Sequence, residues 1–269
     1  MFPLAGKNFP SSSEELDEAI TGALQDVFTL PARQRAATVA GGDYPSVKKL
    51  TINLDGATVS ATQPPPQPKP TGKRQPGITV EQLEVSGRPI CYEQSEVDLH
   101  LKARGVVLEF AKDKKGNPLL VLNDAREGQA EAHIRKDDLR TLVTAIATAA
   151  AKEQGVKIQE IDLDLKSEGK RSIAVDARVK ARKMMVSGVV HLTGRADVDD
   201  ELNATLSNLS CTGEGMIGNM AAGLLQGKLK NYDGKQFPLM AFSLGDVTLR
   251  DLKVDTKDGL KVVAKFGSA

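Results

Sequence analysis

The chain contains no tryptophan, and aromatic residues make up only 4% of its 269 residues. It therefore lacks the interleaved aromatic side chains on which unpaired bases stack, which argues against single-stranded nucleic acid as a partner. The 36 basic and 35 acidic residues give a formal net charge of +1. Because no segment has a marked excess of basic residues, general nucleic-acid binding is not expected either.

Cysteine is almost as scarce, since only Cys91 and Cys211 are present. Two cysteines are too few for a disulfide scaffold. The sequence favours two free, buried thiols, and a single bridge between them is the alternative in an oxidising compartment.

Long apolar runs are also missing, and no stretch approaches the ~20 apolar residues of a membrane-spanning helix. Near the N-terminus, Glu14, Glu15, Asp17 and Glu18 occupy the region where a secretory signal has a basic start and an apolar run. These patterns predict a soluble chain that is cytoplasmic or peripheral to a membrane.

The residues of catalytic and metal sites do not gather into recognisable motifs. His100, His133 and His191 are far apart in the sequence, and neither cysteine has a second thiolate nearby. An acidic cluster lacks the glycine turn and the distal glutamate of a calcium-binding loop, so a solvated loop is expected for Asp197, Asp199, Asp200 and Glu201. No cofactor, metal or enzymatic activity is predicted.

Three glycines, Gly213, Gly215 and Gly218, have the spacing of a dinucleotide-binding G-x-G-x-x-G motif. The residues before them do not belong to a parallel strand–helix–strand unit, and no acidic residue follows in the required context. We therefore expect these glycines to serve close packing and the entry into a helix.

What the chain does contain is a unit that appears twice, at residues 137–182 and 216–266. Each unit is a helix of small and aliphatic residues, followed by strands that alternate apolar and charged side chains. A looser third copy opens the chain, with a helix over 14–29, capped by the serines at 11–13, and a strand over 47–54. Each apolar face needs a partner, either another unit or a lipid.

Alternation also predicts long strands between these units, with hairpin turns near Gly116 and Gly259. Residues 63–77 contain six prolines and predict an exposed loop or linker. The expected fold class is α+β, dominated by long antiparallel strands with a few helices on one face, in a single domain over residues 1–269.

Alanine, glycine and methionine dominate the apolar helix faces, as in residues 145–151 and 216–223. One interpretation is an ordinary, tightly packed core. The other is a groove for an acyl chain, enclosed by curved strands and lined by adaptable methionines. Composition leaves both open.

Three segments carry a family resemblance: AHIRKDDLRTLV from Ala132, VKIQEIDLDL from Val156, and VTLRDLKVDTKDGLKVVAKF from Val247. Their order resembles the LmeA-like phospholipid-binding family, which is similar to the tubular lipid-binding (TULIP) domains of the bactericidal/permeability-increasing (BPI) type. The resemblance covers about the last half of the chain and, more loosely, residues 47–110. It implies a long, strongly twisted antiparallel sheet wrapped around amphipathic helices, with a lipid in an apolar groove, and a bacterial protein.

The leading hypothesis is therefore non-enzymatic binding or transfer of a phospholipid or other acyl-chain lipid, with peripheral membrane contact. The residues expected to line the groove, which can equally be core, are Leu142, Ile146, Val175, Val179, Val190, Met220 and Leu224. The alternative is a structural or protein-interaction module with a fully packed core, which could form a homodimer by pairing of sheet edges.

Overall fold

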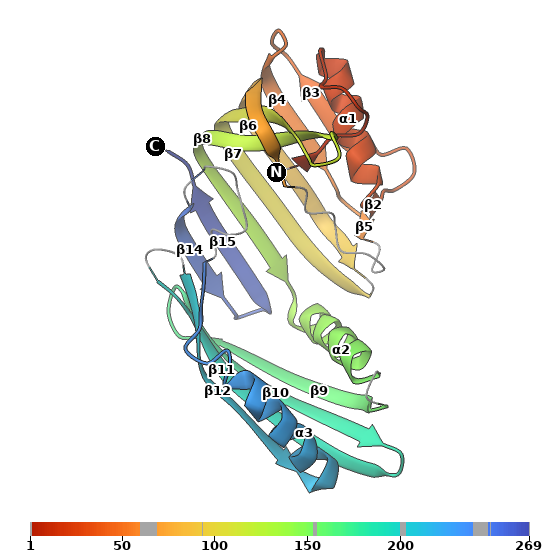
Figure 1. The fold of residues 1–269 in the computed structure, drawn as a ribbon, viewed down its shortest axis with the longest axis vertical. Coiled ribbons are helices and arrows are strands. Elements are labelled where there is room, and N and C mark those ends of the chain that lie inside the picture. The colour runs from red at the N-terminus through yellow and green to blue at the C-terminus, as the bar shows by residue number, and fades with distance from the viewer. Residues whose placement is uncertain are drawn as a thin grey trace. The chain divides into compact units, whose positions relative to one another are not determined.

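The protein is α+β with mostly antiparallel sheets, as the sequence predicts (Figure 1). This computed structural model describes residues 2–59, 69–92, 94–152, 155–199, 203–238, 247 and 249–268, with the side chains of 146, 149, 150, 152, 203, 224, 228, 237 and 238 left out. The chain divides into two compact units, each described separately below. The first comprises residues 1–133, 242–251 and 263–269, and the second 134–241 and 252–262. Two compact units do not by themselves establish two domains, so the single domain over 1–269 stays a prediction.

Ten strands form the larger sheet, whose main path has the order β14-β15-β8-β7-β6-β4-β3. β1 pairs with β8, and β5 pairs with both β2 and β6. β4 and β5 run parallel to β6, and the other described pairs are antiparallel. The strands are β1 (Phe2–Pro3), β2 (Phe28–Thr29), β3 (Ala37–Ala40), β4 (Ser46–Asn53), β5 (Thr58–Val59), β6 (Thr71–Tyr92), β7 (Ser95–Lys112), β8 (Pro118–Ile134), β14 (Leu249–Asp255) and β15 (Leu260–Phe266).

The predicted N-terminal helix is α1 (Ser13–Gln25), which begins at the expected serines. The predicted end at Thr29 is wrong, because Phe28–Thr29 form β2. Ser12 is its N-cap, because the Ser12 hydroxyl accepts a hydrogen bond of 3.2 Å from the backbone N–H of Glu15. The buried face of α1 carries Leu16, Ile20 and Leu24, which belong to the core that includes Leu50 of β4 and Val80 of β6. A helix with apolar residues at this spacing packs one face on a sheet.

The proline-rich segment is only partly a loop. Residues 63–68 lie outside the described residues, but β6 begins at Thr71, so the prediction of a loop through Gly77 is wrong from Thr71 onward. The pairing with β7 shifts register on both sides of Pro76. Such bulges let proline sit within a strand, because a bulge does not require every N–H in the ladder.

The second unit contains a five-stranded antiparallel sheet, in the order β13-β12-β11-β10-β9. Its strands are β9 (Lys157–Ser167), β10 (Ser172–Lys183), β11 (Val186–Val198), β12 (Asn203–Glu214) and β13 (Gln236–Pro238). Helix α2 (Lys136–Lys152) packs against β9, and α3 (Gly215–Leu229) lies against β11 and β12 (Figure 1). The predicted helix and the two predicted strands of residues 137–182 are confirmed as α2, β9 and β10. Residues 239–246 of the second predicted unit lie outside the described residues.

Glycines set how closely α3 approaches the sheet. A Cβ on Gly218 would lie 2.3 Å from the Val189 carbonyl oxygen, and one on Gly213 would lie 2.1 Å from the Gly218 carbonyl oxygen. Gly215 begins α3 at φ +76°, a conformation that favours glycine. The expectation that these three glycines serve close packing and helix entry is confirmed.

Candidate functional site

One face of the five-stranded sheet is apolar, as the alternation in β10 predicts. Residues paired across neighbouring strands point to the same face. The register therefore places each apolar residue of β10 in a row with residues of β9 and β11. These rows are Leu165–Val175–Gly194, Leu163–Ala177–Leu192 and Ile161–Val179–Val190.

Helix α3 covers the part of this face that β11 and β12 form. Val190, Cys211 and Ala222 make a small buried cluster there, with Val179, Leu192 and Leu229 packed against it. Gly188, Gly213 and Gly218 bring the helix backbone against the strands, so protein atoms fill this part of the face.

The part that β9 and β10 form is less covered. Ile161 and Ala177 are buried, but Leu163, Leu165, Ile173 and Val175 are only half-buried. α2 packs along β9, whereas α3 makes its main contacts with β11 and β12. A row of half-buried aliphatic side chains on one face of a sheet provides apolar area that a further apolar group can cover.

The structure divides the residues that we predicted to line a groove. Val175 is half-buried on the less covered strip, and Leu142 is half-buried on α2. Val179 and Val190 pack into the cluster beneath α3, while Met220 is 52% exposed. The side chains of Ile146 and Leu224 lie outside the described residues. The prediction missed Leu163 and Leu165, although they alternate with charged residues in β9 just as Val175 does in β10.

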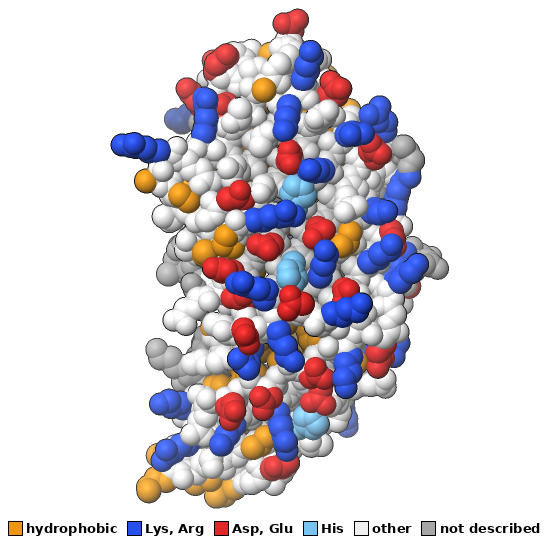
Figure 2. All heavy atoms as spheres, turned by 180° about the vertical axis from the view of Figure 1, so that it is seen from behind, with side chains coloured by type: hydrophobic (Ala, Val, Ile, Leu, Met, Phe, Trp, Pro, Cys, Tyr) orange, Lys and Arg blue, Asp and Glu red, His pale blue; other side chains and the backbone are white. Residues whose placement is uncertain are grey.

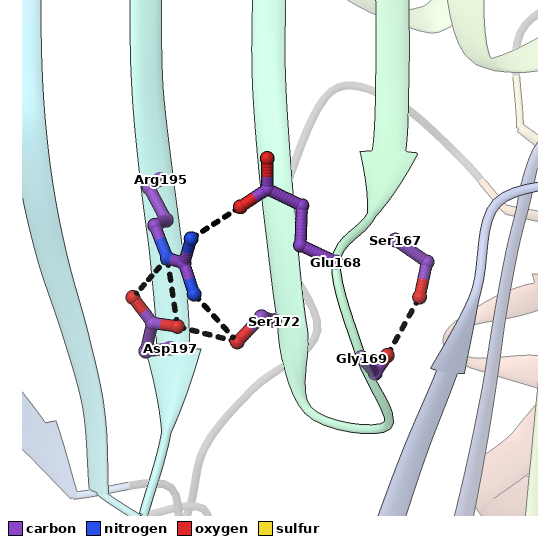
Figure 3. Close-up of polar contacts among 6 residues, drawn as sticks. All are labelled: Ser167, Glu168, Gly169, Ser172, Arg195 and Asp197. Atoms are coloured by element: carbon purple, nitrogen blue, oxygen red, sulfur yellow. Dashed lines mark hydrogen bonds and ion pairs between the residues drawn. The ribbon is translucent and has the colours of Figure 1, made fainter.

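The opposite face of the same sheet is polar and is organised by Arg195 of β11 (Figure 3). The Arg195 Nε donates to both carboxylate oxygens of Asp197, at 2.9 and 2.7 Å. Its terminal nitrogens donate to the Glu168 carboxylate and, at 3.3 Å, to the Ser172 hydroxyl, which itself donates to Asp197. Asp164, Lys166 and Thr193 line the same shallow pocket.

These contacts leave the Arg195 guanidinium neutralised rather than open to a ligand. Two carboxylates face one cation, and they raise the pKa of Arg195. Hydrogen bonds from Arg195 and then Ser172 lower the pKa of the Asp197 carboxyl. We interpret the network as a set of contacts that hold β11 to β10 and to the turn between β9 and β10, not as an anion-binding site.

Replacing Asp197 with asparagine is expected to destabilise the protein by about 0.5–1 kcal/mol at neutral pH, as for exposed ion pairs. Because the folded-state pKa of Asp197 is lowered, its contribution is present above the ordinary carboxyl pKa. The difference between wild type and Asp197→Asn should therefore shrink as the pH falls below about 4. Asp164→Asn is the matched control on the same face, because Asp164 has only a 3.5 Å ion pair with Lys166. Urea unfolding at several pH values tests this, and equal effects of the two variants would contradict it.

The first unit brings together two histidines that the sequence separates. Arg88, Asp98, His100, Glu131 and His133 line a small cavity of about 240 Å³. The His100 Nδ1 is buried without a hydrogen-bond partner. Sequence spacing gave no sign of this pair, because the β7–β8 hairpin makes residues 33 positions apart neighbours.

Neither a metal centre nor a catalytic constellation emerges from the described parts of the chain. No group of three or more His, Cys, Asp or Glu residues there could hold a metal ion. The His191 Nε2 lies 2.7 Å from an Asp176 carboxylate oxygen on the sheet surface. Both cysteines are free, and burial raises the pKa of the Cys211 thiol, which disfavours the reactive thiolate. Of the predicted acidic cluster, Asp197 is bound by Arg195, and residues 200 and 201 lie outside the described residues.

None of the described helices is long and apolar enough to cross a membrane. Comparison of the chain with family models, curated proteins and solved structures returned no match.

Proposed function

We propose that this protein binds a phospholipid or another acyl-chain lipid without catalysing a reaction on it. In this proposal the acyl chain lies over the apolar strip of β9 and β10, on Leu163, Leu165, Ile173 and Val175. The observation that carries the proposal is the half-burial of this aliphatic row beside a helix that packs tightly on the neighbouring strands.

Most of the binding free energy would come from the burial of the acyl chain, so few hydrogen bonds or ion pairs to the lipid are needed. Burial of each methylene of an acyl chain contributes about 0.8 kcal/mol. An apolar strip can therefore bind a lipid with few polar anchors, which agrees with the neutralised state of Arg195 on the opposite face. The expected tubular lipid-binding architecture belongs to this proposal. Figure 1 supports it in one respect, since β9–β12 curve around the side on which α3 lies.

The alternative is a protein-interaction module that dimerises through a sheet edge. The filled cluster under α3 agrees with the packed core of that alternative. β9 lies at one end of the strand order, where a second chain could pair. However, charged residues follow one another along β9 at Lys157, Glu160, Asp162, Asp164 and Lys166, and charges on an edge strand disfavour such pairing. We therefore favour lipid binding.

Thermal unfolding with added phospholipid tests the proposal. A ligand at about 100 times its Kd stabilises the folded state by about 2.7 kcal/mol. For a chain of this size we expect the unfolding temperature to rise by roughly 5–10 °C with a soluble short-chain phosphatidylcholine. A headgroup without acyl chains, glycerophosphocholine, should give no shift. Equal curves with and without the short-chain lipid would contradict the proposal.

A further inference from the structure

The end of the second unit exposes five large apolar side chains, which we call the methionine tip. Met184 and Met185 form the turn between β10 and β11 and are each 89% exposed. The tip is completed by the side chains of Val186, 37% exposed, and of Met216 and Met220 of α3, 70% and 52% exposed.

The two parts of the tip lie side by side. A Cβ on Gly215, the first residue of α3, would lie 3.2 Å from the Ser187 carbonyl oxygen. The start of α3 therefore touches the first residues of β11, immediately after the exposed turn. Figure 2 shows hydrophobic side chains gathered at the lower end of the view, with lysine and arginine side chains beside them. Figure 1 draws the β10–β11 turn and the start of α3 at this end.

The conformation of the turn does not favour methionine at positions 184 and 185. Lys183 pairs with Val186, so Met184 and Met185 form a two-residue turn, in which polar residues and glycine are usual. Met184 adopts φ +53°, a left-handed conformation that glycine or asparagine would adopt at lower cost. Apolar area that is exposed and clustered in this way is typical of an interaction surface.

Cations flank the methionine tip. Lys157, Lys180, Arg182 and Lys183 lie on the ends of β9 and β10 next to the turn, with Lys157 opposite Arg182. The Arg182 Nε donates to the Met184 carbonyl oxygen at 2.8 Å. Of the nearby carboxylates, Glu160 lies opposite Lys180, and Glu214 is 3.3 Å from Arg178. Among the described residues, the cations beside the tip therefore outnumber the carboxylates that face them.

We propose that the methionine tip docks on a membrane surface that contains anionic lipids. Methionines reach the boundary between headgroups and acyl chains, and the flanking lysines and Arg182 contact anionic headgroups. A symmetric contact between two tips would bring the cations of both copies together, so charge favours a membrane over a second copy. This inference goes beyond the proposed lipid binding and stands on other residues.

A single tryptophan tests the docking directly, because the natural chain has none. In Met185→Trp, we expect the tryptophan emission to shift to shorter wavelength when vesicles of equal parts phosphatidylcholine and phosphatidylglycerol are added. Vesicles of phosphatidylcholine alone should give a much smaller shift. No shift with either composition, or the same shift with both, would overturn the proposal.

Removal of lysine charges beside the tip can be compared with removal of the same number of charges elsewhere on the surface. Each cation near an anionic membrane contributes about a fivefold gain in affinity, so Lys180→Gln with Lys183→Gln should weaken vesicle binding about 25-fold. Lys114→Gln with Lys115→Gln removes the same charge from another exposed hairpin turn and should leave binding unchanged. Vesicle flotation measures both, and equal losses would mean that the effect is general rather than local to the tip.

Met184→Ser with Met185→Ser should reduce vesicle binding about tenfold or more, because the apolar contacts are lost. If this variant instead abolishes a self-association of the wild type and leaves vesicle binding intact, the tip is a contact between copies and the proposal is wrong. Stabilisation by soluble phospholipid should be unchanged in this variant. A failure of docking is therefore distinguishable from a failure of lipid binding.

Discussion

Replacing Gly218 with alanine is expected to lower the unfolding temperature by about 5–10 °C, as overpacking of a close contact costs roughly 2–3 kcal/mol. The added Cβ would lie 2.3 Å from the carbonyl oxygen and 3.0 Å from the backbone nitrogen of Val189. Both atoms belong to the backbone of β11, which cannot move away without disturbing the sheet. α3 would have to separate from β11 and β12, opening the cluster of Val190, Cys211 and Ala222.

The control for this prediction lies on the same helix. Apart from its chain neighbours and the adjacent backbone of its own helix, no described heavy atom lies within 4 Å of the position that a Cβ on Gly223 would take, and Gly223 is exposed. Gly223→Ala should therefore stabilise the protein by about 0.5–1 kcal/mol, through helix propensity alone. Differential scanning calorimetry compares the two variants. If they change the unfolding temperature in the same direction, α3 is not held against the sheet as described.

Replacing Val175 with aspartate is expected to abolish the stabilisation by phospholipid. Val175 lies in the middle of the apolar strip, opposite Leu165 of β9. A carboxylate there would be buried beneath an acyl chain without a partner, and such burial costs several kcal/mol. The lipid-dependent rise in unfolding temperature should therefore fall to zero, whatever the change in the stability of the lipid-free protein.

Ala174→Asp introduces the same charge one residue away, on the polar face of the sheet, where Ala174 lines the pocket around Arg195. This control should retain the full lipid-dependent shift. A loss of the shift in both variants would indicate general damage to the sheet. Retention of the shift in Val175→Asp would show that the lipid does not lie on β9 and β10.

Sequence-based prediction was most accurate where the burial of one strand face, or one close backbone contact, determines which residues can occur. The alternation of Ile173, Val175, Ala177 and Val179 predicted β10 almost to its bounds, because every second side chain of this strand faces the apolar side. The glycines at the start of α3 were also interpreted correctly, since their context excluded a nucleotide-binding turn.

Alternation could not show which neighbour covers each apolar residue. Val190 and Val175 have the same pattern in the sequence, yet Val190 lies under α3 and Val175 lies on the less covered strip. Met220 was expected in a groove, but close packing of Gly218 and Ala222 on the sheet leaves Met220 exposed. His100 and His133 line one cavity because of long-range strand register, about which periodicity contains no information.

Native mass spectrometry of the gently purified protein is the most direct test of lipid binding. The account predicts a population of wild-type protein that is heavier by the mass of one phospholipid, and the loss of this population in Val175→Asp but not in Ala174→Asp. A wild-type protein that shows only the mass of the bare chain, even after incubation with phospholipid, would contradict the account.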